Sequence, residues 1–330
     1  MGVGALFIVA IGENPIDAYA ALFRGAFDGK LRLGTTLAGF TPLLLTSIAF
    51  AIAAKAGAFN VGVEGEVFLG GITAAYIGIN WTFLPKPALY VACFVGAMVV
   101  AAAWAFIPAV LRAYYNVNEV CTTILMNTVA LYITSYLVSG PMSAGTANAQ
   151  SLPVTVRLYQ FMKPSSVNVG IFIAAITVIV IIFMLQKSSW GYKIRTVGLN
   201  PTHADYVGID SKKVFIGAMM LSGMLGGMAG CIEVLGVHGY FLNNFATGLG
   251  SNGMLAALIV KNNMVSTPFM AFFLAVLKSG AMGMQQSTGV PKSLVDTITA
   301  VFIIIATMET AFQFTKKRKK QTEEKKEDKA

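Results

Sequence analysis

The chain has 330 residues, of which 56% are hydrophobic and only 12% are charged, and its mean hydropathy is +0.69. A soluble protein carries charge on about a quarter of its residues, so we predict that lipid solvates this chain. The net charge of +9 does not indicate nucleic-acid binding, because residues 316–330 hold 12 of the 39 charges and the others are scattered between apolar runs. The three cysteines lie in apolar runs, which indicates packing residues rather than a disulfide framework.

Apolar runs of membrane-spanning length follow one another along the chain. A helix needs about 20 apolar residues to cross a bilayer, and the runs lack the alternation of β-barrel strands, so we predict an all-α integral membrane protein. Residues 2–12 are apolar but too few to span. They are either the outer half of a first helix whose beginning is missing or a short interfacial or buried segment. The first alternative would bring the number of spans to about ten. The other predicted spans are residues 35–54, 63–79, 87–111, 120–138, 169–185, 214–235, 249–260, 268–284 and 294–314.

Basic residues in the short loops predict the orientation of these spans. Five of them lie in residues 187–213 and five more open the tail at residues 316–320, so both segments are predicted to be cytoplasmic. Four apolar runs separate the two segments. An even number of crossings returns the chain to the same side of the membrane, so the two assignments agree. The same reasoning places residues 112–118 inside and residues 14–34 and 139–168 outside. Residues 1–315 then form the membrane domain, and residues 316–330 a disordered charged cytoplasmic tail.

A polar break at residues 54–66 separates two apolar runs with almost no loop between them. It contains three glycines, one lysine, Asn60 and the carboxylates Glu64 and Glu66. Irregular backbone inside a membrane persists where it is buried in protein or lines a water-filled cavity, and carboxylates there usually face a pathway or a partner. The break is therefore either a broken helix beside a translocation path or a short cytoplasmic turn with solvated charges.

A second break, at residues 237–252, precedes a run of only 12 apolar residues at 249–260. Interrupted or short segments in both halves of a chain are typical of transporters with an internal repeat. Because the predicted topology makes the two halves antiparallel, we consider an inverted repeat possible in this chain.

Four glycines form two pairs at i, i+4 spacing in residues 222–230, namely Gly223 with Gly227 and Gly226 with Gly230. This spacing lets membrane helices approach closely, either inside the bundle or at a subunit interface. Glu233 follows one turn beyond and lies either on a path or near the outer surface.

Glu119 follows Asn118, which is placed to cap a helix whose dipole favours an early acid. Asn127 lies eight residues further on, roughly on the same face, and needs either a neighbouring helix or a passing solute as its partner. Asn60, Glu64, Glu119, Asn127 and Ser222 are therefore our candidates for the translocation path.

The predicted inner loop at residues 188–213 contains a short helix outside the membrane. Asn200 can cap it, Pro201 suits its first position and Gly208 can end it. Two turns are unstable alone, so this helix must dock on something. His203 lies on the solvent side in this interpretation, and the two histidines of the chain have no cysteine beside them, so no metal site is expected.

Motifs of catalysis are missing from the sequence. There is no phosphate-cradling G-x-x-x-x-G-K-[ST] loop, nucleophile elbow or H-E-x-x-H helix, and the non-membrane segments are too short for a catalytic domain. We therefore expect no enzymatic activity, catalytic residue or cofactor in this chain.

Three motifs resemble permease subunits of bacterial ABC importers, in the branch for ribose, simple sugars and nucleosides that is related to the branched-chain amino-acid permeases. The segment 55–66 (KAGAFNVGVEGE) resembles the family signature, and 118–127 (NEVCTTILMN), followed by LVSGP at 137–141, is most similar to nucleoside members. Residues 197–209 resemble the loop G-x-N-x-x-A-A-x-x-x-G-I, with His203 where alanine is usual. That loop forms the coupling helix, which implies a coupling role for Gly198, Asn200, Pro201, Ala204, Tyr206, Gly208 and Ile209.

The resemblance implies a type II importer-like fold and a larger assembly. A second permease, often non-identical, would complete the path, a separate cytoplasmic ATPase would bind ATP and magnesium, and an extracytoplasmic binding protein or lipoprotein would deliver the substrate. A ribose or simple-sugar importer is the nearest alternative. An ion-coupled secondary transporter, with Glu64, Glu66 or Glu233 as its relay, is the alternative from another class.

Overall fold

The computed structural model describes Val9, residues 14–288, Ser293 and Thr297. The chain divides into two compact units, one formed by Ala26–Ser279 and the other by Met1–Gly25 with Gly280–Ala330. Three predicted features lie outside the described residues: residues 2–12 apart from Val9, the last span at 294–314 apart from Thr297, and the tail at 316–330.

The described residues are helical, and their β-pairing is limited to isolated bridges. Six helices are long and apolar enough to cross a membrane, and α10 continues into a π-helix at Glu233–His238 to form one of them. The α-helices are α2 (Pro15–Phe27), α3 (Gly29–Lys55), α4 (Val63–Asn80), α5 (Lys86–Tyr115), α6 (Glu119–Ser139), α7 (Gly170–Lys187), α8 (Ser189–Leu199), α9 (Pro201–Tyr206), α10 (Ser211–Ile232), α11 (Leu249–Ile259) and α12 (Thr267–Thr288).

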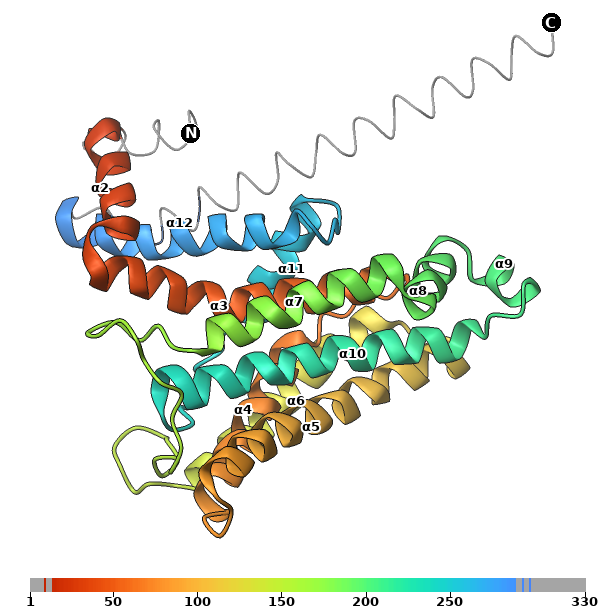
Figure 1. Ribbon diagram of the computed structural model, residues 1–330, viewed down its shortest axis with the longest axis horizontal. Coiled ribbons are helices and arrows are strands. Elements are labelled where there is room, and N and C mark those ends of the chain that lie inside the picture. The colour runs from red at the N-terminus through yellow and green to blue at the C-terminus, as the bar shows by residue number, and fades with distance from the viewer. Residues whose placement is uncertain (1–8, 10–13, 289–292, 294–296, 298–330) are drawn as a thin grey trace, which may run out of the picture. The chain divides into compact units, whose positions relative to one another are not determined.

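Helix α10 is central in the larger unit, where it packs against α3, α4 and α5 (Figure 1). Helix α4 is enclosed as well, since 13 of its 18 residues are buried. It is not one of the six strongly apolar helices, because Glu64, Glu66 and its glycines lower its mean hydropathy. The predicted span at 63–79 is thus a helix, but one that the bundle encloses.

The two ends of the larger unit bring together the segments that were predicted to share a side of the membrane. At one end lie α8 and α9, where Gly198 meets the end of α3 and the Lys212 ammonium lies 4.9 Å from the centre of the Tyr114 ring. At the other end lies the 140–169 segment (Figure 1), where Thr155 N donates to Gly78 O at 3.1 Å.

Two helices occur where loops were predicted. The backbone N–H of Ile16 donates to Asn14 Oδ1 at 3.0 Å at the start of α2, so Asn14 and Pro15 begin a helix as Asn200 and Pro201 do. Helix α3, which follows α2, begins at Gly29 rather than at residue 35. Ser188 caps α8 in the same manner, by accepting from Gly191 N at 3.1 Å.

In the smaller unit, α2 and the end of α12 approach through glycines. A Cβ atom on Gly25 would lie 2.8 Å from the carbonyl oxygen of Gly280 and from the Cα atom of Gly283. The absence of side chains at these positions is therefore what permits the close packing.

Candidate functional site

The first break forms a closed polar network inside the larger unit. Asn60 Nδ2 donates to Glu66 Oε1 and to Ser222 Oγ, both at 2.9 Å, while Asn60 Oδ1 accepts from Gly62 N at 2.9 Å. All three side chains are buried. Within the described residues, Glu66 Oε2 has no hydrogen-bond partner. Asn60 thereby joins the 56–62 loop to α4 and α10.

Asn127 of α6 caps the beginning of α4 from outside that helix. Its Oδ1 accepts from Gly65 N at 2.8 Å and its Nδ2 donates to Val61 O at 2.8 Å. Helix starts leave their first N–H groups without intrahelical partners, and Gly62, the residue before α4, has no side chain that can serve them. The polar groups of Asn127 therefore fasten α6 to the first break.

The second break meets the first at the beginning of α11. Ser251 Oγ donates to Glu64 Oε2 at 3.3 Å, and a Cβ atom on Gly250 would lie 2.6 Å from Glu64 N. A Cβ atom on Gly253 would lie 2.8 Å from Ser47 N on α3. The two interrupted segments, nearly 190 residues apart in sequence, thus form one junction of α3, α4 and α11.

The four glycines of α10 lie against α4 and α5. A Cβ atom on Gly223 would lie 2.6 Å from the carbonyl oxygen of Ala101, and one on Gly226 would lie 2.8 Å from the Cβ atom of Glu66. Gly227 lies against α5 and against Gly70 of α4, and Gly230 against Val67 and Gly71 of α4. The structure therefore places this row inside the unit.

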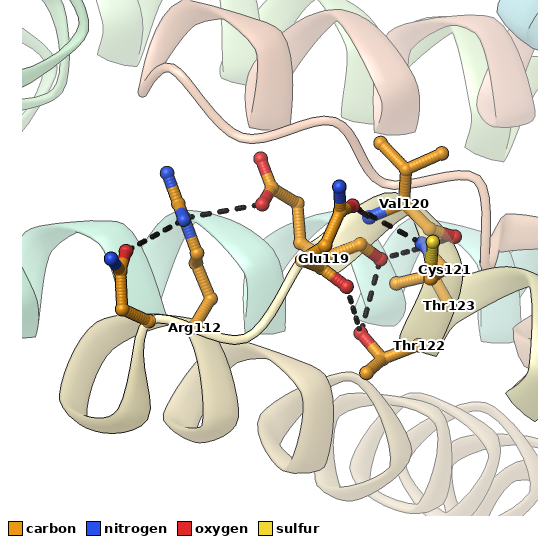
Figure 2. A network of polar contacts seen from close by, with 8 residues as sticks. Arg112, Glu119, Val120, Cys121, Thr122 and Thr123 are labelled. Carbon is orange, nitrogen blue, oxygen red and sulfur yellow. Dashed lines mark hydrogen bonds and ion pairs between the residues drawn. The ribbon is translucent and has the colours of Figure 1, made fainter.

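Glu119 lies at the corner between α5 and α6, beside Arg112 (Figure 2). Arg112 Nε lies 3.1 Å from Glu119 Oε2, and Asn118 Oδ1 accepts from Val120 N at 2.9 Å. Glu119 thus has a charge partner and a helix-start position, and the structure brings it together with none of the other four path candidates.

The α8–α9 segment projects from the end of the larger unit. Asn200 Oδ1 accepts from His203 N at 3.0 Å, Ala204 is buried, and Ile209 N donates to Ala204 O at 2.9 Å. Gly208 has φ +80°, which favours glycine. Leu199 and Tyr206 are 88% and 86% exposed, so the segment presents apolar side chains without a partner among the described residues.

Two carboxylates brace this segment against the start of α10. Asp205 accepts from Ser211 N at 2.9 Å and from Ser211 Oγ at 3.0 Å. Asp210 Oδ1 accepts from Lys213 N at 3.0 Å, and this backbone hydrogen bond lowers the pKa of the Asp210 carboxyl. The short helix therefore begins at a cap, ends at a glycine and is held at both ends.

Glu233 lies in the π-helix, where its Oε2 is 3.6 Å from His238 Nε2. The carbonyl of His238 accepts from Arg157 at 2.7 Å, at the end of the unit where the 140–169 segment lies. No group of three metal-ligating side chains occurs among the described residues. Glu233 is thus near the predicted outer end, and neither its contact with His238 nor that of Arg157 with the His238 carbonyl follows from the sequence.

These features define a multi-pass helical membrane protein with interrupted helices at its centre and a projecting segment at one end. The family described as the branched-chain amino acid transport system permease component matches residues 32–307. The chain belongs to this family of ABC transporter permeases, which are transport components rather than catalytic enzymes.

Relatives match almost the whole chain. It is 32% identical to the guanosine ABC transporter permease protein NupP of Bacillus subtilis, covering 95% of this chain and 92% of that protein. It is 32% identical to the glucose ABC transporter permease protein TsgB13 of Haloferax volcanii (92% and 83% covered) and 31% identical to the nucleoside ABC transporter permease protein NupB of Lactococcus lactis (91% and 86% covered). None of the solved structures matches the chain significantly.

Proposed function

We propose that this chain is the permease subunit of an ATP-driven importer for nucleosides. The observation that carries the proposal is the match, over more than nine-tenths of the chain, to permeases whose names specify guanosine and nucleosides. In this proposal the fold is type II importer-like, with about ten spans over residues 1–315, and the C-terminus is cytoplasmic.

The α8–α9 segment is the proposed docking site for a separate ATPase. Exposed apolar side chains beyond the membrane normally mark a protein interface, and Leu199 and Tyr206 are such side chains. The ATPase would bind ATP and magnesium, so this chain holds no cofactor of its own. Hydrolysis would move α9, and the contact of Gly198 with the end of α3 would pass that motion to the break at residues 56–62.

A second, non-identical permease and an extracytoplasmic binding protein or lipoprotein complete the proposed assembly. Delivery from outside fits the end formed by the 140–169 segment, which is opposite the ATPase end in this proposal.

Uptake of radiolabelled guanosine by cells with and without this gene tests the substrate. We expect uptake to depend on the gene, to be reduced by excess uridine and not by excess ribose or glucose. Competition by glucose or ribose instead would favour a sugar importer, which the similarity to the glucose permease TsgB13 makes the second candidate. Uptake should also persist when the proton gradient is collapsed and stop when ATP is depleted; the reverse would support ion-coupled transport.

Replacing Tyr206 by alanine tests the docking site. We expect Tyr206→Ala to lower uptake and ATPase stimulation by substrate together while the protein still inserts. Tyr115→Ala is the control, because Tyr115 is 72% exposed at the end of α5, outside the α8–α9 segment, whereas Tyr206 is 86% exposed. Equal effects of the two substitutions would contradict ATPase docking at α9.

A further inference from the structure

Helix α6 exposes a row of polar side chains along one face. Counting 100° per residue, the exposed positions Thr128, Tyr132, Tyr136 and Ser139 fall within an arc of about 80° and extend over about 17 Å. Tyr132 and Tyr136 are 69% and 71% exposed. The α6 face, as we call these four residues, is therefore a continuous hydroxyl-bearing stripe on a helix of membrane-spanning length.

The other two outer helices of the unit have no such stripe. Like α6, α5 and α7 have most of their length unburied. The exposed positions of α5 between residues 91 and 107 and of α7 between residues 172 and 183 are all apolar, as lipid contact requires. The α6 face is thus chemically different from its neighbours at the same degree of exposure.

The hydroxyls of the α6 face have no hydrogen-bond partner in the described part of the chain, whereas those on the opposite side of the helix do. Thr123 and Thr134 are buried and donate to the carbonyl oxygens four residues earlier, at 2.7 and 3.0 Å. A polar group placed in hydrocarbon without a partner costs several kcal/mol. The Thr128 and Ser139 hydroxyls can turn onto the carbonyl oxygens four residues earlier, as those of Thr123 and Thr134 do, but the Tyr132 and Tyr136 hydroxyls cannot. The two tyrosines in this row therefore indicate contact with water or a polar ligand.

Tyrosines at the water–lipid interface do not account for the row. Such rings gather at the ends of membrane helices, which fits Tyr136 near the end of α6. Tyr132 and Thr128 lie about 10 and 17 Å before Ser139, below the interface. The row thus reaches the middle of α6 at Thr128, where the exposed Leu125 continues the same face.

We propose that the α6 face lines the water-filled translocation path of the importer and contacts the nucleoside. This inference rests on the proposed function. The rings of Tyr132 and Tyr136 supply apolar surface on which a base can stack, and the hydroxyls of Thr128 and Ser139 supply hydrogen bonds to a ribose. The second permease closes the other side of the path.

The polar side chains that the sequence favoured for the path are occupied inside the unit. Asn60 and Ser222 bond to each other, and Asn127 caps α4 with both of its polar groups. Glu64 and Glu119 have Ser251 and Arg112 as partners. These groups hold the α6 face in place through α4, while the groups of the face itself remain available to a solute.

Cysteine accessibility in cells that express the chain with its chromosomal neighbours tests the proposal. In a Cys121→Ser background the two remaining native cysteines are buried. Thr128→Cys and Tyr132→Cys are then compared with Ile176→Cys on α7, which is 63% exposed on an apolar face. A charged, membrane-impermeant thiosulfonate is applied to intact cells and to inside-out vesicles, and modification is followed by the mass of the protein, which does not require transport.

We expect Thr128→Cys and Tyr132→Cys to react at least tenfold faster than Ile176→Cys on at least one side of the membrane, and several-fold more slowly with saturating guanosine. Reaction as slow as that of Ile176→Cys overturns the proposal, whether lipid, residues 294–314 or a second copy of the chain covers the face. Fast reaction that glucose suppresses and guanosine does not would retain the α6 path and overturn the nucleoside assignment.

Discussion

The packing of Gly230 against α4 predicts a large cost for a single added methyl group. A Cβ atom at this position would lie 2.7 Å from Gly71 N and closer still to the carbonyl oxygen of Val67. Contacts between carbon and oxygen begin at about 3.3 Å, so Gly230→Ala would force α4 and α10 apart by about 1 Å. Backbone atoms cannot turn aside as a side chain can, so we expect a loss near the upper end of the usual overpacking range, about 3 kcal/mol.

Two further substitutions calibrate this prediction. Gly39→Ala in α3 meets no atom within 4 Å and replaces glycine in a helix, so stability should rise by about 1 kcal/mol. Gly226→Ala would place its Cβ atom 2.8 Å from the Cβ atom of Glu66, a milder overlap than that at Gly230, so its cost should lie between the other two.

The free energy of unfolding in detergent, measured by denaturant titration with circular dichroism, gives the comparison. The order of stability should be Gly39→Ala, then Gly226→Ala, then Gly230→Ala, with about 4 kcal/mol between the first and the last. Should Gly230→Ala prove too unstable to purify, the difference in unfolding free energy between Gly226→Ala and Gly39→Ala still shows whether an added methyl group in the glycine row is destabilising. Equal stability of all three would mean that the glycine row does not pack within the chain, and it would favour a subunit interface.

Three other predictions concern the contacts around the first break and the projecting segment. Asn127→Ala should cost about 2 kcal/mol of unfolding free energy because it uncaps α4, whereas Thr128→Ala should be neutral in the same titration. Arg112→Gln should change stability by less than about 1 kcal/mol, because the side chain is 38% exposed; a larger loss would show that the pair with Glu119 is shielded from water. Gly208→Ala should cost about 1–2 kcal/mol locally, seen as faster amide exchange in α9, and unchanged exchange would contradict the left-handed conformation.

Hydropathy sufficed to predict the helical class and most of the spans. It placed the beginning of α3 too late, because the polar residues Lys30 and Arg32 interrupt the apolar pattern although the backbone remains helical. It predicted the span at residues 63–79, which is α4, but could not indicate that neighbouring helices bury most of it. The Asn14-Pro15 pair is a helix-start signal for α2 of the same kind as Asn200-Pro201 for α9.

The sequence was less informative about the partners of polar side chains. Asn60 and Ser222 are 162 residues apart, and no local spacing predicts that they bond. The row Thr128, Tyr132, Tyr136 and Ser139 has helical spacing in the sequence alone. What turns it into a candidate wall is that the opposite face of α6 is occupied by α4, and only the tertiary structure shows this.

The dependence of α4 on later helices has a consequence for biosynthesis. This helix carries Glu64 and Glu66 in its first turn, and removing carboxylates from water without their partners disfavours the insertion of an isolated α4. Asn127, whose amide caps α4, emerges from the ribosome only after α4, and so does α10, which holds Ser222. We therefore expect α4 to remain beside the insertion machinery until α6 and α10 have been synthesised, and a chain truncated before Asn127 to be a substrate for membrane quality control.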